Sequence, residues 1–122
     1  MLQTVKNPLR AKSYEFALAI VNLYKRLQSD QREYVLSKQL LRSATSVGAN
    51  VEEAQQAQSR RDFILKTSIA MKEAYESRYW LRLLQDGGYV PKEKNQKYLQ
   101  QAEEAIALLG TSIQTARNNL NS

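Results

Sequence analysis

Three pairs of closely spaced glutamates are the residues of this chain whose type and spacing best suit chemistry. Paired carboxylates serve di-metal helical bundles and glycoside-cleaving sites, but the di-metal sites also need Glu-x-x-His motifs. The 122 residues contain no histidine and no cysteine, which removes the commonest general base, the commonest metal ligand and all thiol chemistry. We therefore expect no metal, no cofactor and no catalytic residue, and we expect salt bridges instead. The pairs are Glu52-Glu53, Glu73 with Glu76, and Glu103-Glu104.

Aromatic residues form a second candidate group, because aromatic rings stack on unpaired bases. At helical spacing, however, such residues more often belong to a core or to a protein interface. They give one predicted helix a second apolar side, beyond the seam that a single bundle core would use. We therefore expect them to lie in an interface between copies of the chain. The aromatic residues are Tyr75, Tyr79 and Trp80, and Leu83 belongs to the same predicted interface.

Apolar residues recur at steps of three and four through four segments, which predicts four helices. Asn7 and Ser59 are suited to cap helices, and Gly87-Gly88 suits a left-handed helix end. Because the connections are short, the expected fold is an all-α, antiparallel up-down-up-down four-helix bundle, with residues 1–122 as a single domain. The helices are expected over about 8–29, 32–58, 59–86 and from about 91 onward.

The second predicted helix carries a narrow seam of small and apolar residues beside a polar stripe. Gly48 lies in the middle of this helix and predicts close approach of another backbone. In the polar stripe, Asn50 has two interpretations: a contact to nucleic acid, or a hydrogen-bond network between helices that fixes their register. We favour the structural interpretation. The stripe consists of Ser43, Ser46, Asn50 and Glu53.

Basic residues gather at both ends of the predicted bundle. The net charge of +6 favours an anionic partner such as nucleic acid, although many soluble domains carry such a charge for solubility alone. We predict nucleic-acid binding at the first end, where Arg60 and Arg61 are adjacent and flanked by polar residues. That end holds Lys6, Arg10, Lys12, Arg60, Arg61 and Arg117, and the opposite end holds Lys25, Arg26, Arg32, Arg82, Lys92, Lys94 and Lys97.

The chain shows no signal for a membrane. No stretch approaches the ~18–20 apolar residues that a span requires. Residues 1–8 lack the apolar region of a signal peptide. We expect a cytoplasmic protein with no membrane partner.

The segment 41–54, followed by Asp62-Phe63 and by Ile69-Ala70, carries a recognisable pattern. It resembles a bacterial four-helix-bundle family whose founding members are encoded in intervening sequences of large-subunit ribosomal RNA genes. The accessory variability determinant of diversity-generating retroelements resembles the same family. The resemblance covers about residues 10–115, and Ala54 departs from it where glycine is common. The matching residues are Arg42, Ala44, Ser46, Val47, Asn50, Val51 and Glu53.

This resemblance implies a homopentamer, with five bundles arranged as a barrel around a central channel, and it implies nucleic-acid binding. The leading hypothesis is a non-enzymatic homo-oligomer that binds nucleic acid, RNA before DNA, or that serves an RNA–protein assembly. The alternative is a structural or adaptor protein whose oligomer binds another protein and has no nucleic-acid role. An enzyme would need an activated nucleophile or a base poised near neutral pH, and the sequence offers neither.

Overall fold

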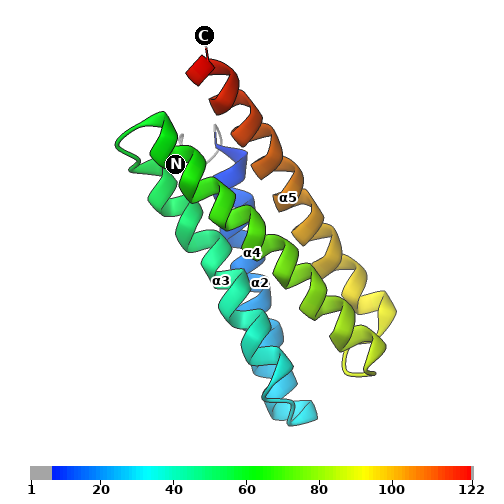
Figure 1. Cartoon of the computed structure of the whole chain (residues 1–122). Coiled ribbons are helices and arrows are strands. Elements are labelled where there is room, and N and C mark those ends of the chain that lie inside the picture. Colours follow the sequence, from blue (N-terminus) through cyan, green and yellow to red (C-terminus); the bar gives the residue numbers. More distant parts are fainter. Residues whose placement is uncertain (1–6, 122) are drawn as a thin grey trace.

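The computed structural model describes residues 7–121, and within them the chain forms four helices and no strand. The expected all-α, four-helix architecture is therefore confirmed. Figure 1 shows that the ribbon reverses direction at each connection, so that the start of the first helix and the end of the last lie at the same end. The helices are α2 (Pro8–Gln31), α3 (Leu36–Gln55), α4 (Arg60–Asp86) and α5 (Lys92–Asn121).

Three of the predicted helix ends are present. The Asn7 side chain accepts a hydrogen bond from the backbone N–H of Arg10 at 3.1 Å, and Ser59 accepts one from Asp62 at 3.1 Å. Each bond satisfies one of the backbone donors that a helix leaves free at its first turn. After α4, Gly88 takes φ +86°, the left-handed conformation that favours glycine.

The second helix begins later than predicted, at Leu36 instead of about Arg32, and it ends at Gln55 instead of Gln58. Arg32 is left-handed, with φ 51°, which terminates α2 and separates it from α3. The carboxylate of Glu33, a residue only 7% exposed, then accepts three backbone hydrogen bonds at the start of α3. The donors are the N–H groups of Val35 at 3.0 Å, Leu36 at 2.9 Å and Ser37 at 2.6 Å.

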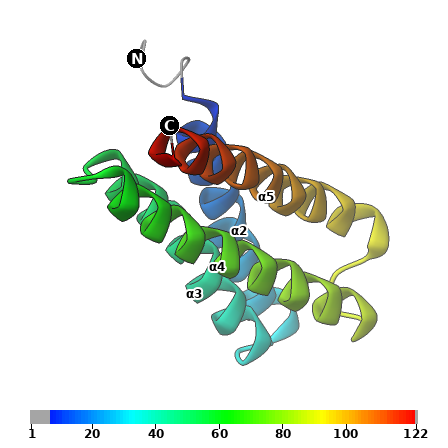
Figure 2. The same ribbon diagram turned by 45° about the horizontal axis from the view of Figure 1, so that its top comes forward.

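The helices pack in a closed ring. Each helix contacts two others, in the pairs α2 with α3, α3 with α4, α4 with α5 and α5 with α2. Figure 2 shows the same arrangement from a second direction, with α4 and α5 in front of α2. Among the described residues, one cluster of buried residues surrounds Phe16 and Leu84, and a second surrounds Val51 and Leu109.

Small residues set the spacing between α3 and α4. Ala44, Ala70 and Ala74 are fully buried, as the narrow seam predicted. Between the two core clusters, the hydroxyls of Ser43 and Ser77 lie 2.8 Å apart and join the two helices by a hydrogen bond. A buried hydroxyl without such a partner would destabilise the interface.

Gly48 faces α2, which confirms that another backbone passes close to it. A Cβ added at Gly48 would lie 3.6 Å from the Cβ of Ala17 and 3.7 Å from the carbonyl oxygen of Ser13. Both distances are ordinary van der Waals contacts. The site therefore has room for one methyl group.

Candidate nucleic-acid interface

The six basic residues predicted to bind nucleic acid do not form one free patch. Arg10 donates two hydrogen bonds to the Glu52 carboxylate, through Nε at 2.6 Å and Nη2 at 3.0 Å. The hydrogen bond and the negative charge of Glu52 raise the pKa of Arg10 above its usual value. Because this guanidinium already has a carboxylate partner, it contributes less to a phosphate site than the sequence suggested.

Two more of the six are also engaged. Lys12 lies 3.5 Å from Glu104 and 4.0 Å from Glu15. Arg60 donates to the backbone carbonyl of Asn119 at 3.3 Å, which links the start of α4 to the end of α5. The sixth predicted residue, Lys6, lies outside the described residues.

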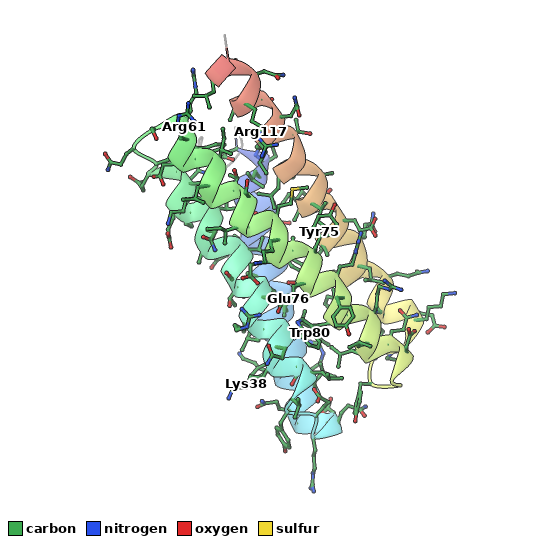
Figure 3. All side chains as sticks on the ribbon, viewed as in Figure 1. Lys38, Arg61, Tyr75, Glu76, Trp80 and Arg117 are labelled. Atoms are coloured by element: carbon green, nitrogen blue, oxygen red, sulfur yellow. The ribbon has the colours of Figure 1, made fainter. Side chains whose placement is uncertain are left out.

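Arg61 and Arg117 remain. Both are exposed, and neither forms an ion pair with any residue that the structure describes. Figure 3 places them toward the same end of the molecule, on α4 and α5. Beside Arg60 there is a shallow hollow of about 510 Å³, which is lined mostly by small alanine, serine and threonine residues. Of the five predicted cations that the structure describes at this end, Arg10 and Lys12 are paired with carboxylates, Arg60 is held by a neutral carbonyl, and Arg61 and Arg117 are free.

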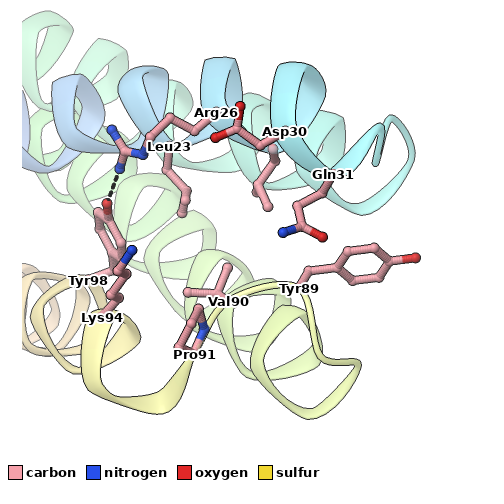
Figure 4. A pocket seen from close by; sticks show the side chains of 10 residues that line it. Leu23, Arg26, Asp30, Gln31, Tyr89, Val90, Pro91, Lys94 and Tyr98 are labelled. Atoms are coloured by element: carbon pink, nitrogen blue, oxygen red, sulfur yellow. Dashed lines mark hydrogen bonds between the residues drawn. The ribbon is translucent and has the colours of Figure 1, made fainter.

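The opposite end carries a smaller pocket between the last turns of α2, the α4–α5 connection and the start of α5 (Figure 4). We call it the Arg26 pocket. Its volume is about 180 Å³, and Leu23, Leu27 and Val90 supply apolar walls. Arg26 and Lys94 bring two positive charges from two different helices. Both residues were predicted at this end from the sequence, and the structure places them around one pocket.

Around the Arg26 pocket, positive charge exceeds negative charge. Within residues 7–121, no ion pair involves the basic residues assigned to this end, whereas the acids of the helix centres are mostly paired with cations. The acidic residues at this end are Asp30, Asp86 and Glu93, together with Glu33 in the α2–α3 connection. The unpaired basic residues are Lys25, Arg26, Arg32, Arg82, Lys92, Lys94 and Lys97.

The pocket itself was not predicted from the sequence. Its signal was present, because Arg26 lies five residues before the end of α2 and Tyr98 lies six residues after the start of α5. The guanidinium of Arg26 donates a hydrogen bond to the hydroxyl of Tyr98. Tyr98 is only 8% exposed, so its ring belongs to the core while its hydroxyl reaches the pocket. A tyrosine can thus pack its ring in the core and still present its hydroxyl to a pocket.

Two aromatic residues of α4 lie on its outer side, while Trp80, between that side and the core, packs against the cluster around Phe16 and Leu84. Tyr75 and Tyr79 are 45% and 52% exposed, which is large for aromatic rings at the centre of a helix. Arg78 lies over the Tyr75 ring, 4.9 Å from its centroid, and Tyr79 meets Trp80 edge to face at 5.1 Å. Leu83 is half-buried, as is Trp80.

Trp80 is also tied to a charged group. Its indole N–H donates to Glu76 at 3.0 Å, and the same carboxylate receives Arg42 of α3. Figure 3 shows Tyr75, Glu76 and Trp80 along α4. The Glu73–Glu76 pair therefore forms salt bridges with a basic residue of the neighbouring helix, as part of the fold.

Asn50 does not join two helices. Its amide donates to the carbonyl oxygen of Ser46 at 2.9 Å and to the Ser46 hydroxyl at 3.1 Å, within α3. The polar stripe does bridge α3 and α4, but it does so through the Ser43–Ser77 hydrogen bond and through Glu53, which lies 2.9 Å from Lys66.

Residues 7–121 contain no group of three or more acidic residues placed to hold a metal ion. No helix among them has the length and apolar character needed to cross a membrane.

Comparisons with known proteins agree with this architecture. The family model described as 23S rRNA-intervening sequence protein matches residues 6–111. A crystal structure from Bacteroides thetaiotaomicron, described as a protein of unknown function from the S23 ribosomal protein family, is 51% identical to this chain. The match covers 88% of this chain and 96% of that one, with a TM-score of 0.87. A comparison with curated proteins gave no significant match.

Proposed function

Since the chain belongs to the 23S rRNA-intervening sequence protein family, we propose that it is a non-enzymatic, homo-oligomeric helical bundle that binds RNA. The observation that carries this proposal is that the acidic side chains of residues 7–121 are mostly paired, whereas the basic ones mostly are not. Most acidic side chains of the described residues are engaged within the fold, while most basic ones are exposed without a carboxylate. A surface of unpaired cations attracts a polyanion and releases its counterions on binding.

A filter-binding titration with RNA at increasing salt tests this function. We expect tight binding at low salt and a steep, linear fall of log affinity with log salt, by about 0.7 for each phosphate neutralised on a single strand. A wild-type protein that binds no RNA at low salt would refute the function. The adaptor alternative, in which the oligomer binds another protein, would then take its place.

Self-association is the second part of the proposal. The protomer, an antiparallel bundle, would assemble into a homopentamer through the outer side of α4, where exposed Tyr75 and Tyr79 lie beside half-buried Trp80 and Leu83. Exposed aromatic surface of this kind is enriched at protein interfaces. A ring of five copies would multiply the positive charge that meets the RNA.

Light scattering on the purified protein measures the assembly. We expect a mass near five times that of one 14.0 kDa chain. Tyr79→Ser should weaken the assembly, while Tyr34→Ser is a matched control, because Tyr34 is equally exposed, at 54%, but lies in the α2–α3 connection. A monomeric wild type, or equal effects of the two substitutions, would contradict this interface.

A further inference from the structure

We propose that the Arg26 pocket binds a single unpaired nucleotide of RNA, with its phosphate between Arg26 and Lys94 and its base against the apolar wall. The inference rests on the proposed RNA-binding function and adds a site and a preference for single strands to it. It also moves the main contact to the end of the bundle opposite to the one that the sequence favoured.

The size of the pocket argues for one base. Its volume of about 180 Å³ corresponds to the space of about six water molecules at liquid density. Leu23, Leu27 and Val90 line the pocket with only 3–5% of each residue exposed, and the partly exposed Tyr89 and the exposed Pro91 line it beside them, so the flat face of a base has apolar side chains to pack against. A double helix presents its bases stacked inside the duplex, and cannot insert one without unpairing it.

The charges argue for a phosphate at the rim. Arg26 donates to the Tyr98 hydroxyl, which is neutral, so the bond orients the guanidinium and leaves its charge available. Lys94 comes from α5, lines the same pocket and forms no ion pair within residues 7–121. Figure 4 shows the Arg26 and Lys94 side chains directed toward the side of the pocket where Tyr98 lies.

The start of α5 strengthens the same preference. This helix begins at Lys92, next to the pocket, and a helix N-terminus carries partial positive charge and free N–H donors. Together with Arg26 of α2 and Lys94 of α5 itself, it adds positive potential at the rim from two helices, which Glu93 in the same first turn partly offsets.

Two further side chains suit the edge of a base. Asp30 and Gln31 line the pocket from the end of α2 and provide carboxylate and amide groups. Asp30 accepts a hydrogen bond from the neighbouring Ser29 hydroxyl at 3.0 Å and retains a second carboxylate oxygen. An acidic peptide would satisfy Arg26 and Lys94, but it has no flat face to pack on the apolar side chains. Asp30 repels any anion, a phosphate included, and so does not distinguish the two ligands.

Matched substitutions test the site. Arg26→Gln and Lys94→Gln should each lower the affinity for a single-stranded oligouridylate of eight nucleotides by about tenfold, and should reduce the salt slope by about 0.7. Arg61→Gln and Arg117→Gln remove equally free cations at the other end, and we expect them to change this affinity less than twofold. Fluorescence anisotropy measures the binding, and circular dichroism shows that each variant is folded. Arg26→Lys should restore part of the affinity.

Nucleotide binding can be observed without a polymer. Titration of uridine monophosphate should shift the NMR methyl signals of Leu23, Leu27 and Val90, and inorganic phosphate or a polyglutamate peptide should shift them much less. Equal shifts with phosphate or peptide would overturn the base contact. Wild-type affinity in Arg26→Gln and Lys94→Gln would overturn the site while RNA binding stands. A wild type that binds no RNA would refute the proposed function and the site together.

Discussion

The buried carboxylate of Glu33 provides the sharpest test of how this fold is held together. Replacing it by glutamine keeps the size of the side chain but leaves one acceptor oxygen for three backbone N–H donors. A hydrogen bond to a charged group contributes about 1.5–3 kcal/mol, and loss of a helix cap costs about 0.5–2 kcal/mol. We therefore expect Glu33→Gln to lower the free energy of unfolding by about 1–2 kcal/mol at neutral pH.

The effect should depend on pH. Burial raises the pKa of the Glu33 carboxyl. The hydrogen bonds from the backbone N–H groups of Leu36, Ser37 and Val35 together lower it by more, so that the pKa lies below the usual value of 4.5. A carboxyl whose pKa is lowered by folding stabilises the fold above the unfolded-state pKa, and this contribution is lost as the pH falls through the folded-state pKa. The difference between wild type and Glu33→Gln should therefore be full at pH 7 and should shrink below about pH 4.

Urea unfolding followed by circular dichroism measures this difference at both pH values. The protein concentration must be kept constant, because self-association stabilises the folded chain. Glu15→Gln is the matched control, since the Glu15 side chain is 59% exposed and its nearest cation among residues 7–121 is 4.0 Å away. A Glu33→Gln protein as stable as wild type, or a difference that does not change with pH, would refute the capping argument.

Four other substitutions should change the same free energy of unfolding. Gly48→Ala should raise it by up to about 1 kcal/mol, because a methyl group fits there and alanine favours a helix interior; a decrease would show that α2 cannot accept it. Gly88→Ala should lower it by about 1–2 kcal/mol, because alanine is strained at φ +86°. Leu109→Ala should cost about 2–5 kcal/mol, and a cost below 1 kcal/mol would contradict its full burial. Ser43→Ala should cost about 1 kcal/mol in the same assay, because Ser77 keeps a bond to its own helix.

Helix ends could be predicted where the residues follow common capping chemistry. Where they do not, the predicted ends were wrong. Asn7, Ser59 and Gly88 are residue types that caps and left-handed turns favour. The α2–α3 connection instead uses a left-handed arginine, Arg32, and a glutamate whose carboxylate reaches forward to three N–H groups. Neither residue type signals a break, so the break was predicted just before Arg32, whereas it lies between Gln31 and Leu36.

The candidate site was less predictable, because it depends on pairing across the bundle. Arg10 and Glu52 are 42 residues apart, and only the packing of α2 on α3 shows that one neutralises the other. Periodicity correctly assigned Arg26 and Lys94 to a common end, but it cannot show that a pocket opens between them. Charge counts therefore located both basic ends, and only the distances distinguish engaged cations from free ones.

The bond between Trp80 and Glu76 has a practical consequence. Trp80 is the only tryptophan in the sequence, and it lies half-buried on the outer side of α4. Its indole also packs against the core cluster around Phe16 and Leu84. Docking of another chain on the outer side of α4 would exclude water from the indole and shift its emission to shorter wavelength, and dilution should reverse the shift as the assembly dissociates. Assembly can thus be followed optically, without any added label.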